Sequence, residues 1–180
     1  TIVVGGRLDL IKSSAALGKG EWLLAEADES DGSFLKLSPE MAVITNIDND
    51  HLEHYKTFSG LVDAFSRFVG RIPFYGLAIL CGDDPVVAKL ASHFPKRVMT
   101  YGFSKNVDLR AENLNGFVFD VSLRGKSLGQ LKLQVPGRHN VLNSLAAVAV
   151  GLELGLTWDK IASGLGHYSG VDRRLQKIGE

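Results

Sequence analysis

With 180 residues, of which 45% are hydrophobic and 22% are charged, the chain is long enough to bury one sizeable core, and this composition excludes a disordered or fibrous protein. Lysine plus arginine and aspartate plus glutamate number 20 each, a balance that excludes a broad electropositive face for duplex nucleic acid or anionic lipid. No apolar stretch approaches the roughly 20 residues needed to span a bilayer, so we expect neither nucleic acid nor a membrane as a partner.

Periodic apolar runs predict an α/β fold in which short strands alternate with helices. This alternation is typical of a mainly parallel sheet that is flanked by helices and joined by right-handed crossovers. The predicted strands of this part cover residues 2–4, 22–25, 41–45, 77–81 and 97–101, and the predicted helices cover residues 61–69 and 85–93. Before the second helix, Asp83-Asp84-Pro85 supplies an N-cap and a first-turn proline.

From residue 107 the pattern changes to short alternating runs, which predict a small antiparallel subsheet. Two such runs, residues 117–123 and 128–135, are separated by Arg124-Gly125-Lys126. Two further helices are expected after the subsheet, over residues 140–154 and 159–165.

A single cysteine, Cys81, lies at the end of one predicted strand, so no disulfide can form within the chain. We interpret it as a small buried hydrophobe, and its isolation predicts a reducing compartment, the cytoplasm. The sequence begins at Thr1 without a methionine, in an apolar run that is already under way, and it ends at Gly179-Glu180. We therefore expect residues 1–180 to be a fragment of a longer protein.

The most informative segment is Glu26-Ala27-Asp28-Glu29-Ser30-Asp31, a dense group of carboxylates that follows the apolar run at residues 22–25. Such a run is typical of a buried parallel strand that delivers side chains to the carboxyl edge of a sheet, where open α/β folds bind ligands. We expect Glu26 to bind a hard divalent cation through oxygen, with Asp28, Glu29 or Asp31 as further contacts. The alternative is a solvated turn with helix-capping carboxylates.

A second polar cluster, residues 48–54, follows the next predicted strand and is expected at the same edge of the sheet. Within it, His51 is predicted to bind a metal or a phosphate oxygen as a neutral imidazole, and a capping or surface histidine is the alternative. His51-Leu52-Glu53-His54 resembles zinc-hydrolase signatures only superficially, because those need histidines four or five residues apart around the glutamate.

Two more groups of polar residues are candidates for nucleotide contacts. Asn140 and Asn143 lie three residues apart near the start of a predicted helix, and two carboxamides on one face suit the edge of a purine. N-capping by Asn140 is the alternative. Arg173-Arg174 follows Gly170 and suits a clamp for phosphate or carboxylate, with ordinary surface charge as the alternative.

The sequence carries no glycine-rich phosphate loop ending in Gly-Lys-Ser/Thr. Gly18-Lys19-Gly20 comes closest, but it lacks the glycine spacing and the hydroxyl. Gly5-Gly6-Arg7 is likewise interpreted as a turn. The nucleotide site predicted above is therefore incomplete within these 180 residues.

Four ordered motifs together resemble the central ATPase domain of the Mur ligases. They are Glu26-Ala-Asp-Glu-Ser-Asp31, Thr45-Asn-Ile-Asp-Asn-Asp-His51, Pro136-Gly-Arg-His-Asn-Val-Leu-Asn143 and Gly170-Val-Asp-Arg-Arg174. The resemblance covers nearly the whole chain and implies a P-loop-type fold whose phosphate loop lies just upstream of the first strand. It further implies that residues 1–180 form the central ATP-binding domain, without the amino-terminal UDP-binding and carboxyl-terminal amino-acid-binding domains, and that this part is inactive alone.

The resemblance also implies cofactors and site residues. ATP and Mg²⁺ would be the cofactors, with Glu26 and His51 holding magnesium ions as catalytic and metal-binding residues. Asn140 and Asn143 would meet the adenine, with His139 beside them in the cofactor site. Arg174 would reach the ribose or phosphates of the nucleotide and would also be catalytic.

Within the family, the chain is most similar to the branch that adds L-alanine to UDP-N-acetylmuramate in peptidoglycan precursor synthesis. These two compounds would be the substrates, and an acyl phosphate would be the intermediate. One alternative is the recycling branch, which joins a tripeptide to the same sugar nucleotide. A second alternative is a non-catalytic nucleotide-binding module that kept the fold and lost the phosphate loop.

Overall fold

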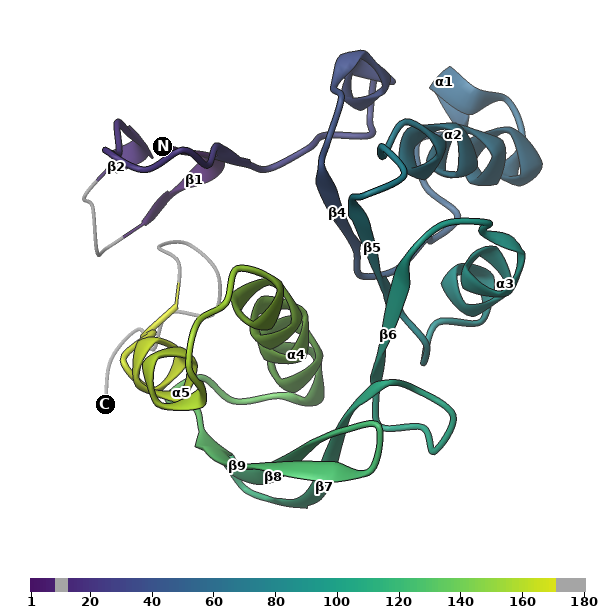
Figure 1. Ribbon diagram of the computed structural model, residues 1–180. Helices are drawn as coiled ribbons and strands as arrows, with labels where there is room; N and C mark the ends of the chain where they lie inside the picture. The colour runs from purple at the N-terminus through teal and green to yellow at the C-terminus, as the bar shows by residue number, and fades with distance from the viewer. Residues whose placement is uncertain (9–12, 171–180) are drawn as a thin grey trace, which may run out of the picture.

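The computed structural model describes residues 1–8 and 13–170 and contains two separate sheets (Figure 1). The first sheet has three strands, β1 (Ile2–Leu8), β2 (Ser13–Ala16) and β3 (Leu24–Ala25), in the order β2-β1-β3. Strand β1 is antiparallel to β2 and parallel to β3.

The second sheet has six strands, in the order β4-β5-β6-β7-β8-β9. Strands β4 to β7 are parallel, and β7, β8 and β9 form an antiparallel meander. Their bounds are Met41–Ile44 for β4, Leu77–Cys81 for β5, Val98–Gly102 for β6, Leu109–Asn115 for β7, Val118–Leu123 for β8 and Lys126–Lys132 for β9.

Helices cover both faces of the parallel strands (Figure 1). Helices α2 (Phe58–Gly70) and α3 (Pro85–His93) lie on one face, and α4 (Arg138–Glu153) lies on the other with α5 (Trp158–Gly166). Two short elements complete the described part, the 3₁₀ helix η1 (Ser33–Lys36) and the one-turn helix α1 (Leu52–Tyr55). Within residues 1–8 and 13–170 there is no helix of the length and apolarity that crossing a bilayer requires.

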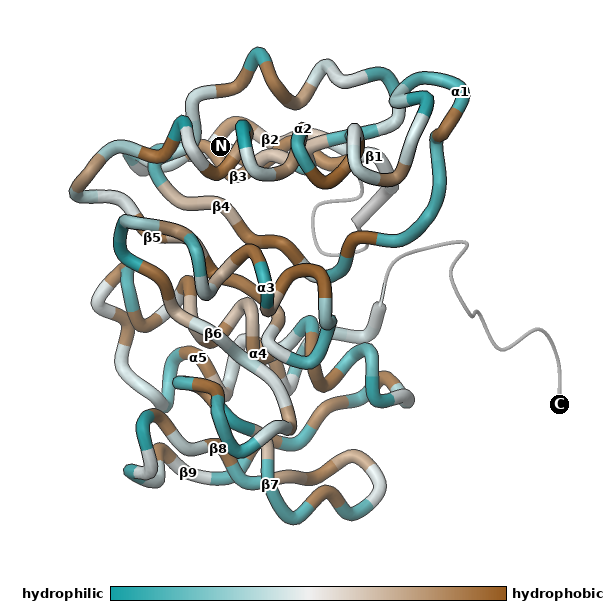
Figure 2. The backbone as a smooth tube through the Cα atoms, turned by 90° about the vertical axis from the view of Figure 1, so that its right-hand side faces the viewer, coloured by the Kyte–Doolittle hydropathy of each residue, from teal (hydrophilic) through white to brown (hydrophobic). Residues whose placement is uncertain are grey.

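The core lies around β5, whose five residues are all buried because helices cover both of its faces. Figure 2 shows hydrophobic residues along this strand in the middle of the molecule. Helix α2 presents a buried stripe that includes Leu61 and Phe68. Phe34 of η1 packs on the stripe, with its ring centroid 4.9 Å from that of Phe68.

The predicted fold class is confirmed, since a mainly parallel sheet is flanked by helices and extended by an antiparallel part. The predicted N-cap of α3 is also confirmed. Asp84 immediately precedes Pro85, the first residue of the helix, and its side chain accepts hydrogen bonds from the amides of Val86 and Val87 at 3.0 and 2.8 Å. The prediction that residues 22–25 form a buried strand is wrong. Leu24 is 59% exposed, because β3 pairs with β1 alone and no described helix covers it.

Asp108 joins the middle of β6 to the turn between β8 and β9. Its carboxylate accepts hydrogen bonds from the amide and the hydroxyl of Thr100 at 2.9 and 3.0 Å, and from Nε of Arg124 at 2.9 Å. Burial raises the pKa of Asp108, but the donors on Thr100 and the Arg124 guanidinium outweigh it and hold this pKa below 3.8.

We expect Asp108→Asn to lower the free energy of unfolding by about 1–3 kcal/mol at neutral pH, because hydrogen bonds to a charged group are replaced by weaker ones. A lowered native pKa contributes stability above the unfolded value and loses it as the pH falls. The difference from the wild type should therefore shrink below pH 3.8. Urea unfolding across a pH series measures this, with Asp63→Asn on the exposed face of α2 as the control. A difference that is constant with pH would contradict it.

Candidate functional site

The carboxyl ends of β4, β5 and β6 lie at one edge of the second sheet, because the three strands are parallel. Polar or aromatic residues follow each strand there, namely Thr45 and Asn46 after β4, Asp83 after β5 and Phe103 after β6. Helix α4 begins at the same edge, since Arg138 lies over the ring of Phe103. This edge is where open α/β sheets bind ligands.

A pocket of about 350 Å³ opens at the end of β4. The acidic segment forms one side of it through Ala27 and Glu29, and Leu61 and Phe65 of α2 line its apolar part. The remaining wall is β4 and the polar loop after it, which contribute Val43, Ile44, Thr45, Asn46, Ile47, Asp48, Asp50 and His51. Oxygen atoms of carboxylates, an amide and a hydroxyl therefore surround a space that is open to solvent.

Two carboxylates of the acidic segment cap local turns. Asp28 accepts a hydrogen bond from the amide of Ser30 at 2.9 Å, and Asp31 accepts one from the amide of Ser33 at 2.8 Å. The Ser30 amide lowers the pKa of Asp28, and the Ser33 hydroxyl and amide lower that of Asp31. The turn of the alternative interpretation therefore fits these two residues, although the N-cap of η1 is Gly32 and has no side-chain cap. Within the acidic segment, Glu29 is the carboxylate that lines the pocket.

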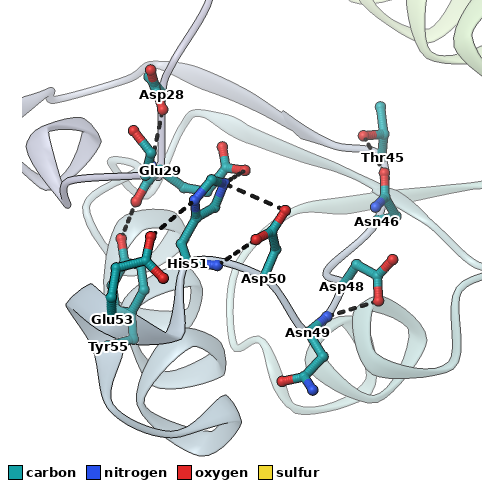
Figure 3. A network of polar contacts seen from close by, with 11 residues as sticks. Asp28, Glu29, Thr45, Asn46, Asp48, Asn49, Asp50, His51, Glu53 and Tyr55 are labelled. Carbon is teal, nitrogen blue, oxygen red and sulfur yellow. Dashed lines mark hydrogen bonds and ion pairs between the residues drawn. The ribbon is translucent and has the colours of Figure 1, made fainter.

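His51 lies among carboxylates at the mouth of the pocket (Figure 3). Its Nε2 atom is 3.7 Å from Oε1 of Glu29 and 3.9 Å from Oδ2 of Asp50, and its Nδ1 atom is 4.0 Å from Oε1 of Glu53. The backbone of His51 is left-handed, with φ 56° and ψ 30°, a conformation uncommon outside glycine. Such outliers concentrate at functional sites, where the surrounding contacts hold them in place.

Tyr55 ties helix α1 to the acidic segment. Its hydroxyl donates a hydrogen bond to the backbone carbonyl of Glu29, which lies 26 residues earlier (Figure 3). Burial raises the pKa of Tyr55, and the negative charge of Glu29 adds to the effect. Because Tyr55 is a donor here, this contact fixes the position of Glu29 next to His51. Tyr55 was not predicted as a site residue, because nothing in the polar residues before it marks it as one.

Glu26 lies apart from this group. Its carboxylate accepts a hydrogen bond from the amide of Gly5 at 2.6 Å, and its side chain is not among those that line the pocket. The structure therefore brings His51 together with Glu29, whereas Glu26 contacts strand β1. The described residues contain no group of three or more histidine, cysteine, aspartate and glutamate side chains arranged to hold a metal ion.

At the start of α4, the N-cap is Gly137, so the alternative that Asn140 caps the helix is wrong. Gly137 has φ 106°, and a Cβ there would lie 2.6 Å from the His139 ring, so both the backbone and the neighbouring ring favour glycine. Asn140 donates a hydrogen bond from Nδ2 to the carbonyl of Pro136 at 2.6 Å. His139 and Asn143 are exposed at this end of the helix.

Two features of this edge were missed by the sequence analysis. The guanidinium of Arg138 lies 4.0 Å from the centre of the Phe103 ring, a cation–π contact that joins α4 to the end of β6. Asp83 accepts hydrogen bonds from the amides of Phe103 and Ser104 at 2.7 and 3.0 Å, which fix the loop that carries this ring. Arg173 and Arg174 lie outside the described residues, so the clamp expected there stays a prediction.

Comparison with known proteins decides the family. The model of the Mur ligase middle domain matches residues 20–151, which is most of the chain. The chain belongs to the Mur ligase family. The resemblance seen in the four ordered motifs is thereby confirmed at the level of the family.

Curated Mur ligases match the chain over its whole length. A UDP-N-acetylmuramate--L-alanine ligase from Bdellovibrio bacteriovorus is 53% identical and one from Xanthomonas campestris is 52% identical, each over 100% of this chain. The chain spans only 41% and 39% of the lengths of these two Mur ligases.

Solved Mur ligase structures show the same fold. The UDP-N-acetylmuramate-alanine ligase from Thermotoga maritima matches with a TM-score of 0.81 and 30% identity, over 96% of this chain and 39% of that one. The UDP-N-acetylmuramate:L-alanyl-gamma-D-glutamyl-meso-diaminopimelate ligase from Neisseria meningitides matches with a TM-score of 0.85 and 25% identity, over 96% of this chain and 58% of that one.

Proposed function

We propose that the chain is the central, nucleotide-binding part of a cytoplasmic ligase that uses ATP to join L-alanine to UDP-N-acetylmuramate in peptidoglycan precursor synthesis. The observation that carries this proposal is the 53% and 52% identity, over the whole chain, to proteins named for that reaction. The chain spans about 40% of these relatives, so the activity is proposed for the longer protein.

In the proposed reaction, the lactyl carboxylate of UDP-N-acetylmuramate attacks the γ-phosphorus of ATP. An acyl phosphate forms and ADP leaves. The amine of L-alanine then attacks the acyl carbon, the C–O bond to phosphate breaks, and the amide and inorganic phosphate are released. The first step brings a carboxylate to a polyphosphate, so it is opposed by charge repulsion that the site must neutralise.

The pocket beside β4 suits such a charge-neutralising site. Mg²⁺ prefers oxygen ligands and commonly takes one or two carboxylates from the protein, with waters and phosphate oxygens completing the shell. We propose that His51 holds a magnesium ion at this pocket and that Glu29, 3.7 Å from His51, orients the imidazole. We propose that Glu26, which lies outside the lining of the pocket, holds a further magnesium ion. When bound, the ions would neutralise phosphate charge and fix the reacting oxygens in line. A cluster of three protein ligands, absent from the described residues, is not required.

We propose that the adenine binds at the start of α4, against Asn140 and Asn143 and beside His139. The support is that α4 begins at the same sheet edge as the pocket, next to the loop after β6. Neighbouring parallel strands lie about 4.8 Å apart, so β6 lies two strand spacings from β4. A nucleoside triphosphate is long enough to span this distance. Arg174 is proposed to contact the ribose or phosphates.

A second candidate is the recycling ligase that joins a tripeptide to the same sugar nucleotide. The match to the Neisseria meningitides ligase, with a TM-score of 0.85, favours it, although that protein is only 25% identical. The much higher identity to the L-alanine ligases is why we place the chain with them. A non-catalytic nucleotide-binding module is the remaining alternative.

The full-length protein, assayed for release of ADP with ATP, Mg²⁺ and UDP-N-acetylmuramate, separates these candidates. We expect turnover with L-alanine and at least about 100-fold lower kcat/KM with the tripeptide, since a site built for one substrate rejects poor fits by such factors. Preference for the tripeptide would assign the chain to the recycling branch. An absence of ADP release with either amine, from a protein shown to be folded, would favour the non-catalytic module.

A further inference from the structure

Helix α1 carries His51 at its amino end, yet little within the helix itself holds it in place. It has a single turn, Leu52–Tyr55, and none of its four residues is buried. Isolated helices of this length are unstable in water. The residues at its two ends, His51 and Lys56, have φ values of 56° and 64°, a conformation that costs free energy in residues other than glycine. Contacts with other parts of the chain must therefore hold this turn.

Tyr55 makes the first of these contacts. Its ring is partly buried against the core, and its hydroxyl donates a hydrogen bond to the backbone carbonyl of Glu29. The same carbonyl accepts a hydrogen bond from the amide of Gly32 at 3.1 Å, which closes the turn of the acidic segment. Tyr55 therefore bonds directly to the atom that closes this turn.

His54 makes a second contact with the same turn. A Cβ at Gly32 would lie 2.8 Å from Nε2 of His54, and Gly32 has φ 72°, so the imidazole lies directly against the backbone of the turn. The His54 ring also meets the Tyr55 ring edge-on, with the ring centroids 4.7 Å apart and an angle of 75° between the planes. Two adjacent side chains thus join α1 to the acidic segment, one by a hydrogen bond and one by packing.

This joint is connected to His51. His51 and Tyr55 are four residues apart, so they lie on the same face of the helical turn. Contacts from both residues meet at Glu29, since Tyr55 holds its carbonyl and Nε2 of His51 lies 3.7 Å from its Oε1 atom (Figure 3). Without the Tyr55 hydroxyl, α1 and the acidic segment could move apart, and the imidazole would no longer be held at a fixed distance from the carboxylate.

We propose that Tyr55 is a positioning residue of the metal site, whose hydroxyl holds α1 against the acidic segment and thereby keeps His51 oriented by Glu29 for a divalent cation. Tyr55 acts without contacting the cation, because its hydroxyl is bonded to a backbone carbonyl and its side chain does not line the pocket. The inference rests on the proposed function in taking His51 as a magnesium ligand, and it adds a residue that determines the affinity for the metal.

Tyr55→Phe in the full-length protein removes the hydroxyl and keeps the ring. The first measurement is amide hydrogen exchange without metal or nucleotide. The amide of His54, which donates to the His51 carbonyl at 3.1 Å, and the amide of Gly32 are expected to exchange about 2- to 10-fold faster, the effect of one lost hydrogen bond. The amide of Ala78, which bonds to Arg97 in the centre of the sheet, should exchange at an unchanged rate.

The second measurement is a titration with Mn²⁺, a paramagnetic substitute for Mg²⁺, followed through the broadening of the His51 ring signal in NMR spectra of the histidine-labelled protein. The Mn²⁺ concentration at half-maximal broadening should rise about 10-fold in Tyr55→Phe, the lower end of the range for residues that orient a metal ligand. Tyr75→Phe is the matched control, because Tyr75 is 55% exposed and lies in the loop before β5, at the opposite edge of the sheet. This control should match the wild type in both measurements.

An unchanged Mn²⁺ midpoint in Tyr55→Phe, or unchanged exchange at His54 and Gly32, would overturn the proposal. A His51 signal that Mn²⁺ does not broaden in the wild type would overturn it as well, because His51 would then hold no metal. None of these outcomes depends on catalysis. The expected shifts in a protein that releases no ADP would refute the proposed ligase function and leave the role of Tyr55 standing. ADP release with an unchanged Mn²⁺ midpoint would do the reverse.

Discussion

In the full-length protein, Glu26→Gln is expected to lower kcat/KM for ligation by at least about 100-fold. Removing a residue that only hydrogen-bonds to a metal ligand costs about 10- to 100-fold, and loss of a ligand itself should cost at least as much. The glutamine carbonyl can still accept the hydrogen bond that the Gly5 amide donates at 2.6 Å, so strand β1 keeps its contact. The negative charge that would attract Mg²⁺ is lost. Steady-state ADP release, measured over a magnesium titration, gives the effect.

Glu53→Gln is the matched control, because the Glu53 side chain is 82% exposed and its carboxylate lies 4.0 Å from Nδ1 of His51, the other residue proposed to hold magnesium. We expect this variant to keep wild-type turnover, and we expect both variants to unfold within about 0.5 kcal/mol of the wild type, as is usual for surface substitutions. Wild-type turnover in Glu26→Gln would mean that Glu26 is only an acceptor for Gly5, and would transfer the metal-binding proposal to Glu29.

Leu80→Ala should be strongly destabilising, lowering the free energy of unfolding by about 2–5 kcal/mol. Leu80 is completely buried in β5, between β4 and β6 and between the helices of both faces. The cavity left by its side chain has no exposed wall that could collapse into it. Urea unfolding followed by circular dichroism measures the loss.

Leu17→Ala removes the same atoms from a side chain that is 92% exposed, so its cost should stay within about 0.5 kcal/mol. Comparing the two variants separates the burial of a leucine from the intrinsic preferences of leucine and alanine. Equal effects at both positions would contradict the placement of the core around β5.

The parts of the fold that local chemistry determines could be predicted from the sequence. Residues 77–81 were predicted as a strand and β5 has these bounds, because a short apolar run buried on both faces differs clearly from its flanks. Helix α3 also has the predicted bounds, since Asp84 and Pro85 define its start. Strand β7, Leu109–Asn115, was missed because its alternation is interrupted by polar residues on a partly exposed strand.

The arrangement of the candidate site could be predicted only in part. Parallel strands carry their following residues to one edge, so the sequence indicated that the acidic segment and His51 would be near each other. It could not show that Glu29, held by Tyr55, is the carboxylate beside His51, because that contact depends on the left-handed turn at His51. The pairing of Phe103 with Arg138 likewise joins segments 35 residues apart in the sequence, and no local pattern encodes it.

The unpaired edge of β3 explains why one prediction was wrong. The apolar run at residues 22–25 has the composition of a buried strand, and the same residues are exposed here because one side of β3 has no partner.

The most direct test of the proposed ligase site is a crystal structure of the full-length protein with Mg²⁺ and a non-hydrolysable ATP analogue. We expect the γ-phosphate and its metal in the pocket between Glu29 and Thr45, with His51 within ligand distance of the metal and the adenine against Asn140 and Asn143. A nucleotide bound at any other edge of the sheet, with this pocket empty, would contradict the assignment of the site.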